Sequence, residues 1–176
     1  MGNDVRQDMI NSSSAFEKLI WPIILPWIGG GDLLRMENIK DSNFARLLDM
    51  KAGIDGWQIR GDGMTGIASR IQQGWKAWDT FTIRMSRTSG AITEYEKRLK
   101  AIETGEYIYP YLTIQAYIKT WSGPVLSVGM AKTSDIITFI KRGLHTIKPT
   151  TNAEFAVCPW DKMKNYKFNV TIKIYE

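Results

Sequence analysis

Apolar residues recur along this chain at two different spacings, and the spacing separates predicted helices from predicted strands. After Ala15 they follow the helical spacing, and Ser13 or Ser14 precedes them as a candidate helix cap. We therefore predict a helix that starts near Ala15 and ends at Pro26. The polar residues 1–14 are predicted to form a flexible N-terminus.

In the next part of the chain apolar and polar residues alternate, which predicts strands. The predicted strands cover Ile54–Arg60, Thr65–Gln72 and Thr80–Ser86. The turn that joins the first two is Gly61-Asp62-Gly63, a sequence typical of a hairpin. We expect the three strands to lie in one central sheet.

The C-terminal half is predicted to continue this mixture of helices and strands. Thr93 and Glu96 have the spacing of a capping box and predict a helix over Glu94–Glu103. The further elements are strands over Tyr111–Ile118 and Val125–Ala131, a helix capped by Thr133 or Ser134 that runs through Arg142, and a last strand over Lys167–Tyr175. This order predicts a single α/β (α+β) domain over residues 15–176, with a central mixed sheet flanked by helices.

Composition limits the classes of function. In these 176 residues no apolar run reaches the roughly 20 residues that cross a bilayer, so we expect no membrane partner. Cys158 is the single cysteine and His145 the single histidine, which excludes an intrachain disulfide and a His/Cys zinc cluster within one chain. This cysteine usage fits the cytoplasm. The net charge of +5 permits a polyanionic partner without requiring one.

Two acidic residues near the first predicted strand are candidate metal ligands. Asp49 and Asp55 are six residues apart, with Gly53 between them. Mg²⁺ binds oxygen ligands and often takes only one or two protein carboxylates, so this pair is enough to propose a site. In the structural alternative, Asp49 caps a turn and Asp55 accepts backbone N–H groups at the entrance of the strand.

A polar face on the strand Thr65–Gln72 is the second candidate. Alternation places Ala68, Arg70 and Gln72 on that face. Arg70 can hold a phosphate through two hydrogen bonds, and Gln72 can bind an ion or a base through its side-chain amide. The alternative is a sheet face that contacts solvent alone.

Arg84 and Arg87 follow in the next predicted strand. If this strand forms a hairpin with the preceding one, Arg84 lies beside Arg70. Two arginines so close to each other need a bound anion or a carboxylate, for which Glu37 and Asp55 are the candidates.

Aromatic and basic residues outside these strands are candidates for nucleic-acid binding. Trp75 and Trp78 flank Lys76 in a predicted loop, where the two rings can stack unpaired bases. Arg87 is a further candidate contact. In the alternative, the two tryptophans belong to the core or its rim.

Basic residues also occur in the helix predicted after Thr93. The pairs Glu94–Lys97 and Glu96–Lys100 have helical spacing, which indicates mainly a solvated surface helix. In the alternative, Lys97 and Lys100 line a nucleic-acid channel together with Arg98.

With these elements in place, the chain resembles the PD-(D/E)XK nuclease-like superfamily, in the form of a small phage- or mobile-element-type protein. The resemblance covers roughly residues 15–142. Its elements are the N-terminal helix with Glu17, the AGID segment ending at Asp55, the strands GIASRIQ and DTFTIRMSR, the capped helix with the strand YLTIQAYI, and the segment VLSVGMAKTSDIITFIKRG.

The resemblance implies a restriction-endonuclease-like core that hydrolyses DNA with Mg²⁺ or Mn²⁺. Asp55 matches the aspartate of the family's first strand, and Arg70-Ile71-Gln72 stands where the family has an acid-x-Lys pair. Because Arg70 is no metal ligand, the missing carboxylate falls to one of three acidic residues, Glu37, Asp49 or Glu17.

The first hypothesis is therefore a Mg²⁺-dependent DNA endonuclease or a nuclease-derived DNA-processing protein. Its catalytic residues are Asp55, Gln72, Arg70 and Arg84, where Arg84 replaces the family's lysine at the phosphate. The alternative is a nuclease-fold protein without catalysis that inhibits a host defence system or binds nucleic acid. DNA is the expected partner, and a protein partner or a homodimer is a further expectation.

Overall fold

The strands of the protein form two sheets instead of one. The computed structural model describes residues 2–36, 43, 52–61 and 63–175. The large sheet has the order β1 (Asp32–Arg35), β2 (Gly56–Arg60), β3 (Gly63–Gln73), β5 (Leu112–Ile118), β6 (Val125–Lys132) and β9 (Val170–Ile174). The small sheet has the order β4 (Thr80–Arg87), β8 (Ala153–Pro159) and β7 (Thr146–Pro149). The predicted mixed α/β domain with a central mixed sheet is confirmed, but the strand predicted over Thr80–Ser86 lies in the separate small sheet.

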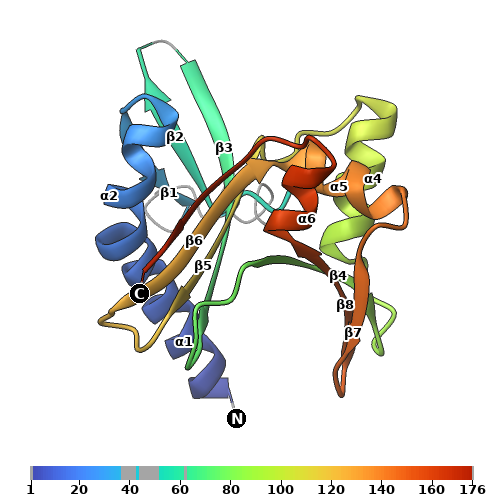
Figure 1. Cartoon of the computed structure of the whole chain (residues 1–176), viewed down its shortest axis with the longest axis horizontal. Coiled ribbons are helices and arrows are strands. Elements are labelled where there is room, and N and C mark those ends of the chain that lie inside the picture. The colour runs from blue at the N-terminus through green and yellow to red at the C-terminus, as the bar shows by residue number, and fades with distance from the viewer. Residues whose placement is uncertain (1, 37–42, 44–51, 62, 176) are drawn as a thin grey trace.

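Helices lie on both sides of the large sheet (Figure 1). On one side the N-terminal helical segment runs through α1 (Gly2–Ala15), a π-helical turn (Phe16–Ile20), α2 (Trp21–Ile24) and a 3₁₀ turn (Leu25–Ile28). On the other side lie the small sheet, α4 (Glu94–Thr104), α5 (Thr133–Lys141) and α6 (Trp160–Asn165). Among the described residues no helix has the length and apolar character needed to cross a membrane.

The alternation along β5 divides the core into two clusters. Ile114 and Ile118 face the N-terminal helical segment and pack in one cluster with Phe16. Tyr117 faces the other way and packs with Phe81 of the small sheet. Each fully buried side chain of this size stabilises the fold by about 1.5–3 kcal/mol, so both faces of the large sheet carry a substantial part of the stability.

The N-terminal helix begins earlier than predicted. It starts at Gly2, and the expected cap at Ser13 or Ser14 is absent because Ala15 already has helical backbone angles, with φ −65° and ψ −39°. Ser13 instead accepts a hydrogen bond from Nη2 of Arg35 at 2.8 Å. The serines are therefore interior positions of a longer helix, because no proline or glycine interrupts the chain between Gly2 and Pro22.

The hairpin considered between the strands Thr65–Gln72 and Thr80–Ser86 does not form. β3 lies between β2, with which it pairs antiparallel, and β5, with which it pairs parallel. Both edges of β3 are thus occupied, and β4 pairs with β8 in the small sheet. The sequence pattern predicted the strand itself but not its partner.

The C-terminal predictions are largely confirmed. Helix α4 carries the predicted capping box and ends at Gly105, and β5 pairs antiparallel with β6. Helix α5 forms, but its N-cap is Lys132 and not Thr133 or Ser134. The hydroxyl of Thr133 is hydrogen-bonded to that of Thr113 at 2.8 Å inside the core. Strands β7 and β8 and helix α6 were not predicted.

Candidate functional site

A cavity between the two sheets gathers most of the predicted charged residues. Its volume is about 290 Å³, and strands β3, β4 and β5 line it together with helix α4. Its charged lining comprises five cations and two carboxylates, namely Arg70, Arg84, Arg87, Lys97, Arg98, Asp55 and Glu94. We name it the arginine cavity.

Asp55 reaches the arginine cavity from the position before β2. Its own N–H donates to the carbonyl of Ile67 on β3 at 2.8 Å, next to the last strand pair between Gly56 and Ile67. The N–H of Ser69 then donates to Oδ2 of Asp55 at 2.6 Å. The carboxylate thus takes the place of a backbone acceptor just before β2 begins. This confirms the structural role considered for Asp55 and fixes its carboxylate at the cavity.

Arg70 and Arg84 come from different sheets and meet over one aromatic ring. Their guanidinium carbons lie 4.7 Å and 5.3 Å from the ring centroid of Phe155 on β8. Burial, followed by the positive charge of Arg84, lowers the pKa of Arg70 from its ordinary value. The two arginines therefore converge as predicted, but through Phe155 and not through a hairpin. A bound anion would relieve their repulsion.

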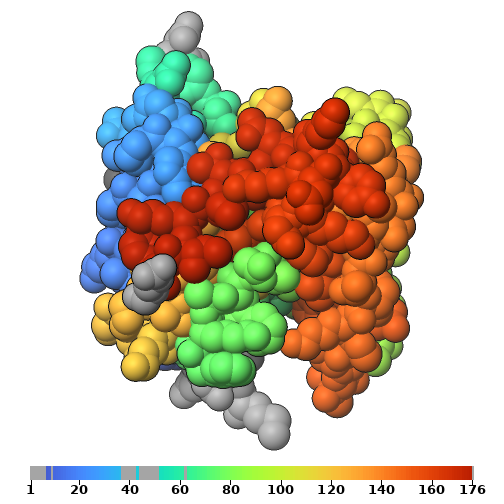
Figure 2. All heavy atoms as spheres, in the orientation of Figure 1, coloured from blue at the N-terminus to red at the C-terminus, as the bar shows by residue number. Residues whose placement is uncertain are grey.

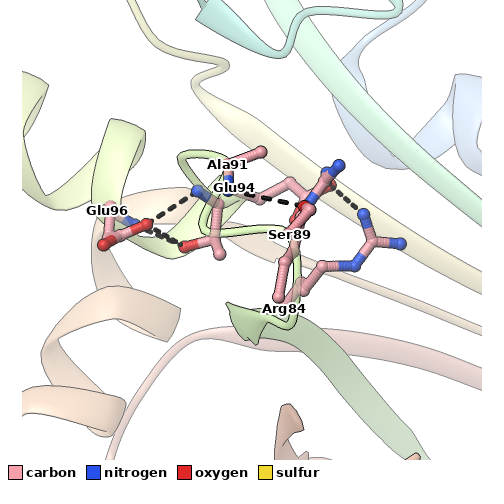
Figure 3. Close-up of polar contacts among 7 residues, drawn as sticks. Arg84, Ser89, Ala91, Glu94 and Glu96 are labelled. Carbon is pink, nitrogen blue, oxygen red and sulfur yellow. Dashed lines mark hydrogen bonds and ion pairs between the residues drawn. The ribbon is translucent and has the colours of Figure 1, made fainter. Parts of the chain in front are cut away.

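Glu94, in the first turn of α4, forms ion pairs with both arginines of β4. Its Oε1 lies 3.4 Å from Nη1 of Arg84 and 3.3 Å from Nη2 of Arg87. Figure 3 shows the side chain of Arg84 beside Glu94. The second carboxylate oxygen of Glu94, Oε2, is buried and accepts no hydrogen bond from the described residues. One oxygen of Glu94 thus serves two cations, and the other is available for a ligand.

Arg98 lies one helical turn after Glu94 and is buried, with 6% of its surface exposed. Burial lowers the pKa of Arg98, while the charges of Asp55 and Glu94 oppose that shift. The Nε atoms of Arg98 and Arg87 are buried and donate no hydrogen bond within the described part of the chain. Buried polar atoms are rarely left without partners, so these donors indicate a place for a polar ligand.

Gln115 forms the floor of the arginine cavity and joins the two sheets. Its Nε2 donates to Oε1 of Gln72 at 2.9 Å, and its own Oε1 accepts from the N–H and the hydroxyl of Thr82 at 3.3 Å and 3.2 Å. The side-chain oxygen of Gln72, predicted to bind an ion or a base, therefore accepts a hydrogen bond within the protein.

A second cavity of about 350 Å³ adjoins the first and shares Arg70 and Thr82 with it. It lies between β3, β5 and the small sheet, and its aromatic lining comes from Trp78, Tyr117 and Phe155. We name it the tryptophan cavity. Both cavities thus lie between the sheets, with Arg70 and Thr82 in the lining of each.

The loop after β3 holds the predicted aromatic and basic group. Trp75 is 82% exposed and Trp78 36% exposed, and the Nζ of Lys76 lies 3.9 Å from the ring centroid of Trp78. From β7, the Nζ of Lys148 lies 5.9 Å from the same ring. The placement of Trp75, Lys76 and Trp78 in one exposed loop is confirmed. Arg87 belongs to the arginine cavity instead.

The arginine cavity contains two carboxylates that are candidate ligands of a magnesium ion. Within residues 2–36, 43, 52–61 and 63–175 there is no cluster of three or more His, Cys, Asp or Glu side chains. Mg²⁺ commonly takes one or two protein carboxylates together with water and substrate phosphates, and Asp55 and Glu94 are the two carboxylates in the lining of this cavity.

The other predicted carboxylates do not add to this pair. Glu37 and Asp49 lie outside the described residues. Glu17 is exposed on the N-terminal helical segment, on the opposite side of the large sheet from the arginine cavity.

The sequence predictions missed several residues of the site. Glu94 was interpreted only as part of a solvated helix face, although it lies four residues from Arg98 on α4 and therefore shares a helix face with it. Phe155 and Gln115 had no local signal, because their roles depend on the contact between the two sheets. Of the three residues in the alternative of a channel, Lys97 and Arg98 line the cavity and Lys100 does not.

Comparison of the chain with protein-family models, with curated proteins and with solved structures finds no significant match. The resemblance to PD-(D/E)XK nucleases therefore stays a prediction.

Proposed function

We propose that the protein binds the phosphate backbone of DNA in the arginine cavity. The observation that carries this proposal is the convergence of five cationic side chains on a cavity that holds two carboxylates. Guanidinium groups match phosphate oxygens with paired hydrogen bonds, and a phosphodiester supplies the negative charge that offsets the surplus. In a buried setting each such contact is stronger than on an open surface.

The variant Arg70→Met tests this proposal. It keeps an apolar contact with Phe155 and removes the charge, so we expect weaker DNA binding and a salt dependence reduced by about one unit of the log–log slope. The matched control is Arg142→Met, because Arg142 lies 5.6 Å over the ring of Phe168 and does not line the cavity. Fluorescence anisotropy with labelled DNA over a salt series measures both quantities. Equal affinity and slope for the two variants would contradict the proposal.

A second candidate function is hydrolysis of the bound phosphodiester with Mg²⁺ or Mn²⁺. It is favoured by the placement of Asp55 and Glu94 in the same cavity as the phosphate-binding arginines. Asp55 and Glu94 would hold the ion, and Arg70 and Arg84 would hold the scissile phosphate. A bound Mg²⁺ would polarise the phosphate and lower the pKa of a bound water. In this form the nuclease hypothesis takes Glu94 as its second acid.

The variants Asp55→Asn and Glu94→Gln test the second candidate. Both keep the size of the side chain and remove a ligand charge, so we expect each to lower Mg²⁺-dependent cleavage by at least about 10- to 100-fold. Binding of DNA should persist, because the cavity becomes more positive. The control is Glu103→Gln, which removes a surface ion pair to Lys141 at 2.6 Å. If the unaltered protein cleaves no DNA when Mg²⁺ is added, the hydrolysis candidate fails and the binding proposal is unaffected.

DNA as the partner and the cytoplasm as the location are part of the same proposal. A homodimer or a protein partner is a further prediction. Light scattering of the purified protein, alone and with DNA, measures the mass of each species and tests the dimer directly.

A further inference from the structure

The tryptophan cavity lies next to the proposed phosphate site. Arg70 and Thr82 line both cavities, so a phosphate held by Arg70 in the arginine cavity lies next to the tryptophan cavity. This step rests on the proposed function, because it takes the arginine cavity as the phosphate site.

The lining of the tryptophan cavity suits a flat aromatic group with polar edges. Its aromatic lining comes from Trp78, Tyr117 and Phe155, and its polar lining includes the amides of Gln72 and Gln73. Its volume of about 350 Å³ is at the lower end of the range for ligand pockets, which run from about 300 to 1,000 Å³. A nucleobase has this combination of an apolar face and a hydrogen-bonding edge.

Trp78 is held in place for such a contact although it lies in a loop. The hydroxyl of Ser127 on β6 donates to the carbonyl of Trp78, and the N–H of Trp160 donates to the carbonyl of Asp79 at 2.8 Å. The loop is thus anchored to both the large sheet and α6. In Figure 2 the surface after β3 (green) and the β7–β8 hairpin (orange) stand apart, with a notch between them.

A nucleic acid that occupies both cavities must place a phosphate in one and a base in the other. This requirement distinguishes single-stranded from double-stranded nucleic acid. In a duplex the bases are stacked and paired inside, and a protein pocket takes a base only when that base has left the stack. We infer that the ligand is single-stranded nucleic acid, with a phosphate on Arg70 and an adjoining base in the tryptophan cavity against Trp78.

The experiment compares binding of labelled single-stranded DNA, single-stranded RNA and a DNA duplex of the same sequence by fluorescence anisotropy. We expect the unaltered protein to prefer a single strand, DNA or RNA, over the duplex. We also expect Trp78→Ala to weaken single-strand binding by about 5- to 150-fold and to leave duplex binding unchanged. Trp78→Phe, which keeps a ring, should restore most of the loss.

The control is Tyr107→Ala, because Tyr107 is also an exposed ring, 49% exposed, with the Nζ of Lys100 at 4.9 Å, and it does not line the tryptophan cavity. If Trp78→Ala changes nothing, or weakens duplex and single strand equally, the base site is overturned while the phosphate site stands. If Arg70→Met and Arg142→Met bind every nucleic acid alike, the proposed function fails, and the base site fails with it.

Discussion

At the scale of single residues, the arginine cavity shows how several cations are accommodated close together. Arg70 lies against the face of Phe155, and Arg87 pairs with Glu94. Arg98 is buried near carboxylates that favour its charged form. Each arrangement lowers the cost of one charge but leaves a positive surplus in the cavity. That surplus is the electrostatic reason to expect an anionic ligand.

Cys158 gives a residue-scale prediction about reactivity. It is 0% exposed on β8, and burial raises the pKa of its thiol to about 12. Because the thiolate is the reactive form, we expect a thiol reagent at about pH 8 to label the native protein far more slowly than the urea-unfolded protein. It is the single cysteine, so the labelling rate reports this residue alone. Equal rates in the two states would contradict its burial.

The same thiol gives a prediction about stability at alkaline pH. Below the ordinary value of 9.0 the thiol is protonated in both states, and its full contribution is present. As the pH rises from 9.0 toward about 12, only the unfolded thiol ionises, so the free energy of unfolding falls. The variant Cys158→Ala should be less stable than the unaltered protein at neutral pH, but its free energy of unfolding should fall less between pH 9.0 and about 12. Urea titrations at several pH values measure both slopes, and parallel slopes would show that Cys158 contributes nothing.

Sequence alternation was informative at the residue scale where the backbone fixes the direction of side chains. It placed Arg70 and Gln72 on one face of β3, and both do line the tryptophan cavity. It could not show that Gln72 is engaged by Gln115, because that contact crosses from one strand to the next. It also could not show that Arg98 is buried, since burial on a helix depends on what covers each face.

At the scale of elements, the N-terminal cap of α4 positions the three residues of this helix that line the arginine cavity, Glu94, Lys97 and Arg98. Oγ1 of Thr93 accepts from the N–H of Glu96 at 3.3 Å, and Oε2 of Glu96 accepts from the N–H of Thr93 at 2.7 Å; Figure 3 labels Glu96 in this contact. We expect Thr93→Ala to lower the free energy of unfolding by about 0.5–2 kcal/mol, measured in urea. Because Glu94 lies in the same turn, DNA affinity should also change.

The control for this prediction lies at the other end of α4. Thr104 donates to the carbonyl of Lys100 at 3.0 Å in an exposed position, so Thr104→Ala should cost much less. If the two variants lose the same stability, the capping box does not position the helix.

The cap also predicts a dependence on pH in the acid range. Hydrogen bonds from the backbone and the hydroxyl of Thr93 lower the pKa of Glu96. The contribution of the Glu96 carboxylate is therefore present above its ordinary pKa and is lost as the pH falls through the lowered value. We expect the stability difference between the unaltered protein and Thr93→Ala to shrink in acid. Thermal unfolding at a series of pH values measures it, and a constant difference would contradict the carboxylate's role.

The elements themselves were largely predictable, but their partners were not. The capping box at Thr93 and the β-rich composition of Tyr111–Ile118 are local signals, and both elements formed where predicted. Strand β4 has equally clear alternation but pairs with β8, which is about 70 residues away in sequence and was not predicted. Pairing at that distance depends on which edges remain open, and local patterning does not encode this.

At the scale of the whole molecule, the site exists because the two sheets are held at a fixed separation. Gln115 joins them by hydrogen bonds to Thr82. Trp160, fully buried, packs against Phe81 of the small sheet and Tyr117 of the large sheet, with ring centroids 5.6 Å and 6.4 Å away. The packing around Trp160 therefore sets the spacing on which both cavities depend.

Gly129 on β6 makes this dependence testable. A Cβ at Gly129 would lie 2.4 Å from Cε2 of Trp160, so an added methyl must displace the ring. We expect Gly129→Ala to destabilise the fold by about 1–3 kcal/mol, measured by urea unfolding. It should also weaken DNA binding, because Tyr117 contacts the displaced ring and lines the tryptophan cavity. The control is Gly63→Ala, where the Cβ would be 3.5 Å from the Arg60 carbonyl oxygen, an ordinary contact. If Gly129→Ala unfolds like the control and binds DNA normally, Trp160 does not set the spacing of the sheets.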